Sequence, residues 1–183
     1  AASYSGLHDA QSRLSIIAAS YPSAHAKLDD FEYSNIGYNI LAIWFDEYYG
    51  MDWRDTLDET VLKPLGLTKT TGYVSHAQDM NWPLAQPYSY KVDQGLSPLY
   101  LRKTDKTMYS VGLMATARDT ARFVAMHMSD GKLDSRQIFS KSVIQDQRRQ
   151  HIKTEGGYFD GYAWGWMTGD FQGHSTRFHT GGF

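Results

Sequence analysis

Apolar side chains recur at helical spacing over much of the chain, and most regularly in the stretch that begins at Asn35. There they return every three or four residues, which is the spacing of one buried helical face. Gly50 is the kind of residue that ends such a helix, because glycine adopts the left-handed conformation without strain. We therefore predict a helix over 35–49 whose buried face consists of Ile36, Ile40, Ile43 and Trp44.

Two polar side chains stand at the start of this helix. Tyr33 and Asn35 place a phenol and a carboxamide two residues apart, where loop meets helix. A rigid element can hold such a pair firmly at the edge of a cleft. The alternative is that Asn35 only caps the helix and that Tyr33 is a core phenol, since Asn is a favoured N-cap residue. The spacing alone leaves both interpretations open.

Two more helices are expected in the first third of the chain. One covers residues 6–20 and ends at Tyr21-Pro22-Ser23, which breaks a helix. Asp52 can cap the other, over residues 53–62, and we expect Pro64 to end it because proline disfavours helix at the residue before it. The residues expected to face inward from the first of these helices are Leu7, Leu14, Ile17 and Ala18.

Two further helices are expected in the second half. Thr116 and Asp119 have the spacing of a capping box ahead of a helix over 117–128, and Gly131 is expected to stop it. Ser140 can cap a last helix that runs to about residue 151. The buried stripe of the 117–128 helix is expected to consist of Ala117, Ala121, Val124 and Met128.

The pattern changes from helical to strand-like near the end of the chain. Segments 158–168 and 175–180 look like two strands, and residues 169–173 between them are a hairpin signal. An isolated hairpin is marginal in water, so we expect this one to pair with strands that the chain does not supply. The fold class predicted is α+β: a helical domain over 1–157 with a long cleft-lining loop over 68–110, and a β-hairpin over 158–183 from an incomplete antiparallel sheet.

The composition narrows the functional classes. A formal net charge of -2 gives no electrostatic case for binding nucleic acid or an anionic membrane. The absence of cysteine excludes disulfides, thiolate metal sites and a cysteine nucleophile, and no apolar run approaches the ~20 residues of a membrane span. His174 and His179 are five apart on a predicted strand and so face opposite sides, and we expect no metal site and no cofactor.

Several short blocks occur in an order that is more specific than any one of them. They are Tyr33-Ser34-Asn35, Pro64-Leu65-Gly66-Leu67, Gly112–Asp119 and His179-Thr180-Gly181-Gly182, the last preceded by Tyr162-Ala-Trp-Gly-Trp166. In this order they resemble the serine β-lactamase and penicillin-binding-protein superfamily, in its class C, D-alanyl-D-alanine carboxypeptidase and esterase branch. The resemblance runs from about Phe31 to the end of the chain.

The resemblance implies a role for each matching residue. Tyr33 would shuttle a proton, and Asn35 would hold the amide or carbonyl of the substrate. His179, Thr180 and Gly181 would line the opposite wall, and the backbone N–H of Gly182 would be one of two oxyanion donors. His179 stands where most β-lactamases have lysine, which favours a peptidase or esterase because histidine attracts a carboxylate more weakly. An extracytoplasmic location, periplasmic or secreted, is also implied.

One motif of the superfamily has no counterpart in its usual place. The nucleophile belongs to a Ser-x-x-Lys motif upstream of Tyr-x-Asn, and nothing before Tyr33 fits it. Ser129-Asp-Gly-Lys132 has the spacing, but it comes after Tyr33 and Gly131 argues against helical geometry, so we interpret it as unrelated. The chain is therefore expected to be an interior piece of its parent. A free phenol has a pKa of about 10, and the cation that would lower it is that missing lysine, so we expect no acyl-enzyme from this chain alone.

Two hypotheses of different classes follow. The first is that the parent is a serine acyl-transfer hydrolase acting on an amide or ester carbonyl, with this chain inactive by itself. The second is a non-catalytic relative that keeps the cleft for binding or assembly, and the upstream gene sequence would distinguish the two. A proteolytic or cloned fragment without a function of its own is a third possibility. Since half a sheet exposes apolar surface, we also expect self-association, or pairing with a complementary chain, through the hairpin 158–183.

Overall fold

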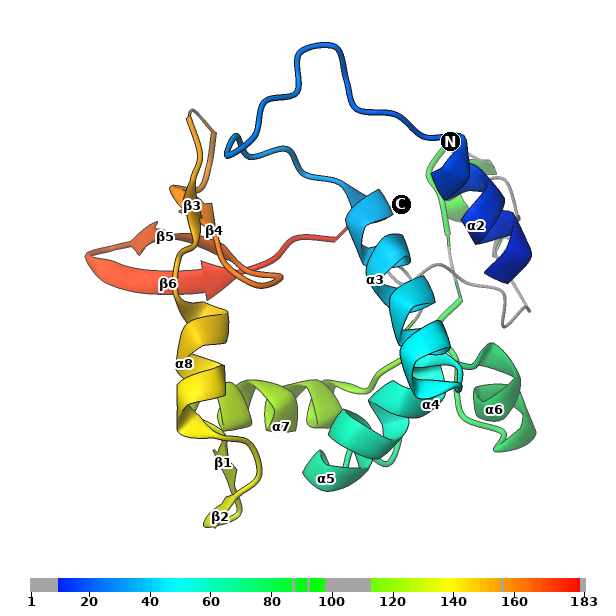
Figure 1. Cartoon of the computed structure of the whole chain (residues 1–183). Helices are drawn as coiled ribbons and strands as arrows, with labels where there is room; N and C mark the ends of the chain where they lie inside the picture. Colours follow the sequence, from blue (N-terminus) through cyan, green and yellow to red (C-terminus); the bar gives the residue numbers. More distant parts are fainter. Residues whose placement is uncertain (1–9, 87, 92, 98–112, 156, 182–183) are drawn as a thin grey trace. The chain divides into compact units, whose positions relative to one another are not determined.

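The computed structural model of the chain describes residues 10–86, 88–91, 93–97, 113–155 and 157–181 (Figure 1). Its contacts group into two compact units, which are described separately below. The first unit comprises residues 1–20 and 35–120, and the second comprises residues 21–34 and 121–183. Among the described residues, no helix is both long enough and apolar enough to cross a membrane.

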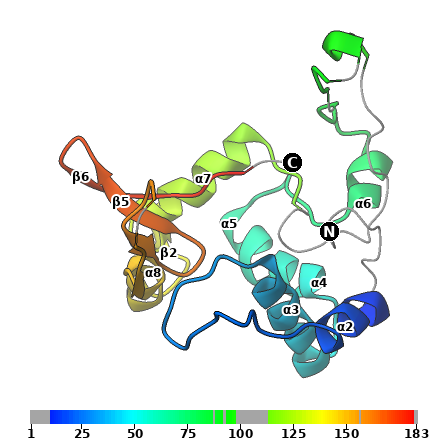
Figure 2. The same cartoon turned by 90° about the horizontal axis from the view of Figure 1, so that it is seen from above.

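The first unit is helical and is built around α3 (Asn35–Tyr49), which contacts α2 (Ala10–Ala18) and α4 (Trp53–Leu57), as Figure 2 shows. The predicted end of α3 is confirmed, since Gly50 follows it with φ +64. The predicted buried face is wrong: Ile36, Ile40 and Trp44 are exposed, whereas Asn39 and Ala42 are buried. Apolar side chains encircle this helix, so their spacing fits more than one face.

The inward residues predicted for the first helix are also wrong where they can be compared. Leu14 and Ala18 of α2 are both exposed, while Ile17 is half-buried. Leu7 lies outside the described residues. A helix of nine residues with apolar side chains on several sides has no single face that its sequence alone can identify.

The Asp52 cap is confirmed, because its carboxylate accepts a hydrogen bond of 2.9 Å from the Arg54 backbone N–H. The predicted effect of Pro64 is wrong. After α4 the chain continues through a π-helical segment, η1 (Asp58–Leu62), into α5 (Lys63–Leu65), and it ends only at Gly66, which has φ 65. The Lys63 N–H donates to the Asp58 carbonyl, five residues back, so the turn before the proline is wider than an α turn. The wider turn is how the helix accommodates a residue that lacks an N–H.

The segment after α5 contains elements that its weak pattern did not predict. These are the short helix α6 (Val74–Asp79) and the turn η2 (Asp93–Gly95). Thr71 and Met114 form an antiparallel bridge through two hydrogen bonds of 2.9 Å. The core of this unit lies between these elements and consists of Trp53, Leu62, Leu65, Leu67, Val74 and Ala77.

The ends of α7 (Ala117–Met128) follow the sequence signals. The Thr116 hydroxyl accepts a hydrogen bond of 3.2 Å from the Asp119 N–H, and Gly131 follows the helix with φ 86. The predicted stripe is wrong, because the four residues named for it are all exposed and the buried ones are Asp119, Met126 and His127. The two polar side chains among these are buried because other groups pack against them or bind them, which apolar spacing does not register.

The second unit contains two small antiparallel sheets. The first pairs β1 (Lys132–Leu133) with β2 (Arg136–Gln137) and is followed by α8 (Lys141–Arg148). The second has the order β3 (Ile152–Lys153), β4 (Gly161–Tyr162), β5 (Met167–Phe171), β6 (His174–Phe178) (Figure 1). Ser140 precedes α8 as predicted, although its hydroxyl pairs with that of Ser142 at 2.8 Å.

The predicted hairpin exists, but its turn is tighter than expected. β5 and β6 pair as far as Phe171 and His174, so only Gln172 and Gly173 form the turn, and both have positive φ. This conformation matches the right-handed twist of a hairpin. The expectation that its partners lie outside the chain is wrong for β5, because β4 pairs with it on the other side. Trp164 and Trp166 lie in the turn between β4 and β5.

The fold class is α+β, as predicted, with helices in both units and antiparallel sheets in the second. The second unit has its own small core, which includes Met126, Ile144, Ala163 and Met167. The domain boundary predicted between residues 157 and 158 stays a prediction, because the compactness of these units does not identify the parent domain of each segment.

Candidate active site

A cavity of about 240 Å³ lies within the second unit, at the end of β6. Four separate stretches of chain form it. Tyr33 comes from the segment before α3, Tyr158 and Phe159 from the connection between β3 and β4, and Met167 from β5. The segment that follows β6 closes it with His179, Thr180 and Gly181.

Aromatic contacts hold the segment that carries Tyr33. The Tyr33 ring lies 6.0 Å from the His179 ring and 6.2 Å from the Tyr162 ring, measured between centroids. Phe31 packs on Tyr162 at 5.0 Å and edge-on to Phe159 at 5.9 Å. Each such pair contributes about 0.5–1.5 kcal/mol beyond its buried area. A segment without regular structure is thus fixed against β4 by its rings.

His179 is oriented by the backbone next to it. Its Nδ1 lies 2.6 Å from the Thr180 carbonyl oxygen. A carbonyl can only accept, so Nδ1 carries the proton in this contact, and in the neutral ring Nε2 is then an acceptor. The Thr180 hydroxyl lies 3.4 Å from the Tyr158 hydroxyl, so the connection between β3 and β4 also contacts this wall. The arrangement can present a phenol, an imidazole nitrogen and a hydroxyl to one bound group.

The cavity has few charges. The side chains described around it are phenols, an imidazole, a hydroxyl and apolar groups. An uncharged group therefore fits this cavity without leaving an ion unpaired.

The structure brings together four of the six residues predicted for the site. Tyr33, His179, Thr180 and Gly181 line the one cavity, while their roles stay predictions. Asn35 is the first residue of α3 in the other unit, where its carbonyl accepts a hydrogen bond of 2.8 Å from the Asn39 side chain. Gly182 lies outside the described residues.

Three lining residues were not predicted from the sequence. They are Tyr158, Phe159 and Met167. The adjacent aromatic pair at 158–159 was assigned to the start of a predicted strand. The pair was therefore not considered as part of the site. In the structure this pair precedes β4 and is free of the sheet, so both rings can turn toward the end of β6.

The structure also describes the Ser-x-x-Lys spacing at 129–132 and the side chains that could bind a metal. Ser129 lies in the turn after α7 and Lys132 begins β1, so these two residues do not share a helical turn, as was predicted from Gly131. Within the described ranges, no three metal-ligating side chains gather closely enough to hold a metal ion.

A family model described as Beta-lactamase matches residues 6–183. No curated protein matches the chain. Among solved structures, the chain is similar to an octameric penicillin-binding protein homologue from Pyrococcus abyssi, with 20% identity and a TM-score of 0.74 over 92% of this chain and 37% of that one. At this identity the similarity shows the fold.

Two more solved structures show the same similarity of fold. A mutant of a class C β-lactamase has 20% identity and a TM-score of 0.62, covering 84% of this chain and 40% of that one. D-amino acid amidase from Ochrobactrum anthropi, complexed with L-phenylalanine amide, has 18% identity and a TM-score of 0.57 over 81% and 43%. The chain thus spans less than half the length of each of these three structures.

Proposed function

The chain belongs to the β-lactamase family, and from this premise we propose that it forms one wall of the acyl-transfer site of a serine hydrolase. The observation that best supports this is that Tyr33, His179, Thr180 and Gly181, from segments far apart in the sequence, line a single cavity. The substrate is an amide or ester whose acyl group passes to a serine and then to water or another acceptor.

Each residue has a part in this proposal. Tyr33 moves the proton between the nucleophile and the leaving group, and His179 Nε2, as the acceptor, is the neighbour that can hold the phenol in place. Thr180 binds a polar group of the substrate. Asn35 holds its carbonyl or amide, and the Gly182 N–H stabilises the oxyanion.

The substrate class follows from the charges of the cavity. A permanent cation is absent from the described lining, and a histidine attracts a carboxylate only when it is protonated. This favours an esterase, amidase or D-amino acid peptidase over a β-lactamase. The amidase with which this fold is shared was solved with an aromatic amino acid amide, so phenylalanine amide is a suitable first probe.

The chain by itself is proposed to be inactive. No Ser-x-x-Lys precedes Tyr33 in the sequence, and Ser129 and Lys132 are placed in a turn and a strand. The nucleophile would come from sequence upstream of residue 1, in an extracytoplasmic protein of the periplasm or cell exterior.

Intact-mass measurement with a fluorophosphonate and a penicillin tests the proposal. We expect no adduct on the 183-residue chain and one adduct on the full-length protein, at an upstream serine. Hydrolysis of phenylalanine amide and of a neutral ester by the full-length protein should fall at least about 100-fold in Tyr33→Phe, the usual loss when a proton-transfer group is removed. Tyr21→Phe, at an exposed tyrosine of the same segment, is the matched control.

The alternative is a non-catalytic module that keeps the cavity for binding or assembly. A full-length protein with an intact Ser-x-x-Lys that forms no adduct and hydrolyses neither substrate would favour this alternative. An adduct on the isolated chain would instead overturn the proposed inactivity.

We also propose that the chain associates through the segment 158–183. β6 is the last strand of the described sheet, and a strand edge of this kind pairs readily with another chain. The homologue from Pyrococcus abyssi is octameric, which supports association as a property of this fold. Light scattering that shows a monomer across a wide concentration range would contradict it.

A further inference from the structure

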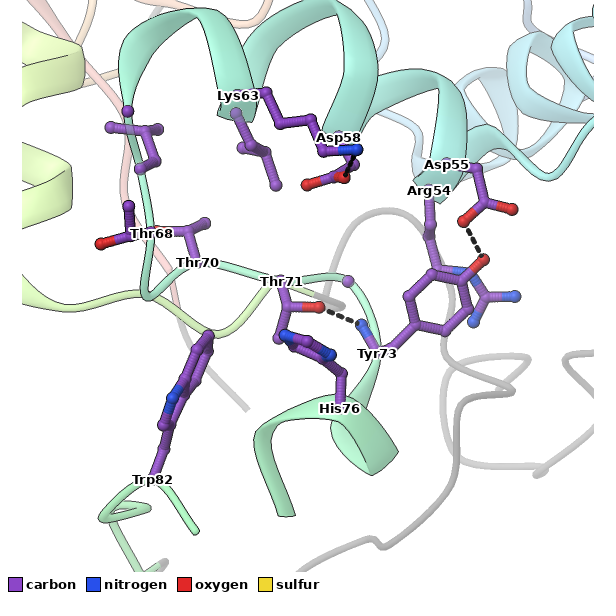
Figure 3. A pocket seen from close by; sticks show the side chains of 14 residues that line it. Arg54, Asp55, Asp58, Lys63, Thr68, Thr70, Thr71, Tyr73, His76 and Trp82 are labelled. Atoms are coloured by element: carbon purple, nitrogen blue, oxygen red, sulfur yellow. Dashed lines mark hydrogen bonds and ion pairs between the residues drawn. The ribbon is translucent and has the colours of Figure 1, made fainter. Parts of the chain in front are cut away.

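A second cavity, of about 440 Å³, lies wholly within the first unit and shares no residue with the candidate active site. Helical residues from α4 to α5 form one side, and the chain from Gly66 to Trp82 forms the other (Figure 3). Asp58 and Lys63 lie across the cavity from His76 and Trp82. Its volume falls within the range of about 300–1,000 Å³ that small-molecule sites occupy.

The two permanent cations around this cavity already have acidic partners. The Arg54 guanidinium donates to Asp52 through Nε and Nη2, both at 2.8 Å. The Lys63 ammonium pairs with Asp58 at 3.0 Å and also with Glu59. An anionic ligand would have to displace one of these acidic partners or be held without a cation, and either is costly. The cavity therefore disfavours an anionic ligand.

Hydrogen-bonding groups nevertheless surround the space. Asp55 accepts a bond of 2.8 Å from the Tyr73 hydroxyl, which uses one of the about four acceptor positions of a carboxylate. Thr68, Thr70 and Thr71 also line the cavity. The Thr70 hydroxyl donates to Asp119, whereas the Thr71 hydroxyl accepts a bond of 3.0 Å from the Tyr73 N–H and can still donate. A carboxylate that accepts and a hydroxyl that can donate suit a ligand with several hydroxyl groups of its own.

One side of the cavity is apolar and flat. Trp82 is half-buried, and His76 meets its ring edge-on with centroids 5.4 Å apart, which fixes the orientation of the indole. Leu62 and Leu67 are buried and form part of the lining. A ring with polar edges and a C–H face would satisfy both sides at once, since aromatic side chains offer a large contact area at little conformational cost.

From this combination we propose that the cavity binds a hydroxyl-rich ring without a negative charge, of the size of a simple sugar, with Trp82 as its apolar platform. The site is independent of the acyl-transfer function, because no residue is shared between the two cavities.

Three related rings of different charge test this in NMR titrations of the 183-residue chain. Glucose is the neutral ring, glucuronate carries a carboxylate and glucosamine carries an ammonium group. We expect saturable shifts of one of the five Trp indole N–H signals with glucose, and binding at least roughly fivefold weaker for glucuronate, because its carboxylate would have to displace an acidic partner of Arg54 or Lys63. Glucosamine should bind no more weakly than glucose, because its ammonium group can pair with Asp55. Equal or tighter binding of glucuronate, or no saturable shift with glucose at tens of millimolar, overturns the proposal.

Two variants connect the binding to this cavity. Trp82→Ala should weaken glucose binding at least about tenfold, as removal of an aromatic anchor usually does. Trp164→Ala is the matched control, since Trp164 is exposed in the other unit and lines neither cavity. If Trp82→Ala does not fold, His76→Ala, at an exposed side chain that orients the indole, takes its place. Unchanged binding in the folded variant places the sugar elsewhere and overturns the assignment.

Discussion

The Asp119 carboxylate accepts a hydrogen bond of 2.9 Å from the Thr70 hydroxyl, a residue 49 positions earlier in the chain. The same carboxylate oxygen accepts a bond of 2.8 Å from the Lys69 N–H. Asp119 is only 3% exposed, so these bonds are shielded from water. These bonds hold the start of α7 against residues 69–71, the stretch in which Thr71 pairs with Met114. They therefore fix one wall of the proposed sugar site.

Removing this carboxylate should destabilise the first unit. We expect Asp119→Ala to lower the free energy of unfolding by about 3 kcal/mol, because two donors lose a charged acceptor in a buried place. Asp119→Asn should cost less, since its amide oxygen can still accept. Urea denaturation measures both. The control is Arg149→Ala, which breaks an exposed pair with Asp146 and should cost less than about 1 kcal/mol. Equal losses in Asp119→Ala and Arg149→Ala would contradict the assigned role.

The parts of the fold that the sequence predicted are those with a local cause. Asp52 and Thr116 cap the helices that follow them, and Gly50 ends α3 in the left-handed conformation. Each of these depends on the chemistry of one residue and on hydrogen bonds within a few positions. The hairpin of β5 and β6 belongs to the same class, with a turn that is set by Gln172 and Gly173.

The burial of helix faces could not be predicted in this way. On α7 the apolar spacing indicated Val124 and Met128, whereas the buried positions include Asp119 and His127. Whether a polar side chain is buried depends on partners far away in sequence, such as Lys69 and Thr70 for Asp119. The π turn before Pro64 could not be predicted either, because it depends on the packing of Leu62 and Leu65 as well as on the local preference of proline. In the sequence, Pro64 was interpreted as the end of the helix.

The residues of the candidate active site also fall into those that the sequence predicted and those that depend on pairing between distant segments. Tyr33 and His179 were found because ordered motifs carry them, and the structure places their rings 6.0 Å apart. Tyr158 and Phe159 reach the cavity only because β4 begins after them, at Gly161. That boundary depends on pairing with β3 and β5, which no pattern within residues 158–168 specifies.

Two glycines with the same backbone conformation should respond differently to alanine. Gly131 (φ +86) and Gly173 (φ +80) are both left-handed, but a Cβ at Gly131 would lie 2.3 Å from the Phe139 carbonyl oxygen. At Gly173 nothing described lies within 4 Å of that position. We expect Gly173→Ala to cost about 1–2 kcal/mol from backbone strain alone, and Gly131→Ala to cost about 1–3 kcal/mol more because of the clash. Denaturant melts of the two variants measure the difference, and equal costs would show that the 139 carbonyl moves aside freely.

Tyr73 should ionise only at a higher pH than an ordinary phenol. Burial, and then its hydrogen bond to Asp55, raise the pKa of Tyr73 above the ordinary value of 10.0. A raised folded-state pKa gives stability that is present below pH 10 and is lost as the pH rises through the higher value. In a spectrophotometric alkaline titration, Tyr73→Phe should remove a late ionisation step. Tyr90→Phe, at an exposed side chain, should leave that late step in place, and its survival in Tyr73→Phe would contradict the assignment.

His127 should make the second unit sensitive to acid. Its ring is buried against Phe123 and Trp166, with centroids 4.5 Å and 5.4 Å away, and the Arg148 guanidinium donates to its carbonyl at 2.8 Å. Burial first, and then the charge of Arg148, lower the pKa of His127 below its usual 6.5. The unfolded chain therefore binds a proton more readily than the folded one. The resulting stability is present above about pH 6.5 and is lost as the pH falls from there toward the lower folded-state value.

The slope of stability against pH isolates this effect from the packing of the ring. Urea melts between pH 5 and pH 8 should show stability falling below about pH 6.5 in the natural sequence and a flatter profile in His127→Phe, which keeps an aromatic ring but cannot bind a proton. His174→Phe, at an exposed histidine of β6, is the matched control. A change in overall stability without a change in slope in His127→Phe would mean that His127 binds protons equally readily in the folded and the unfolded chain. That result would contradict the lowering of its pKa by burial and by the Arg148 guanidinium.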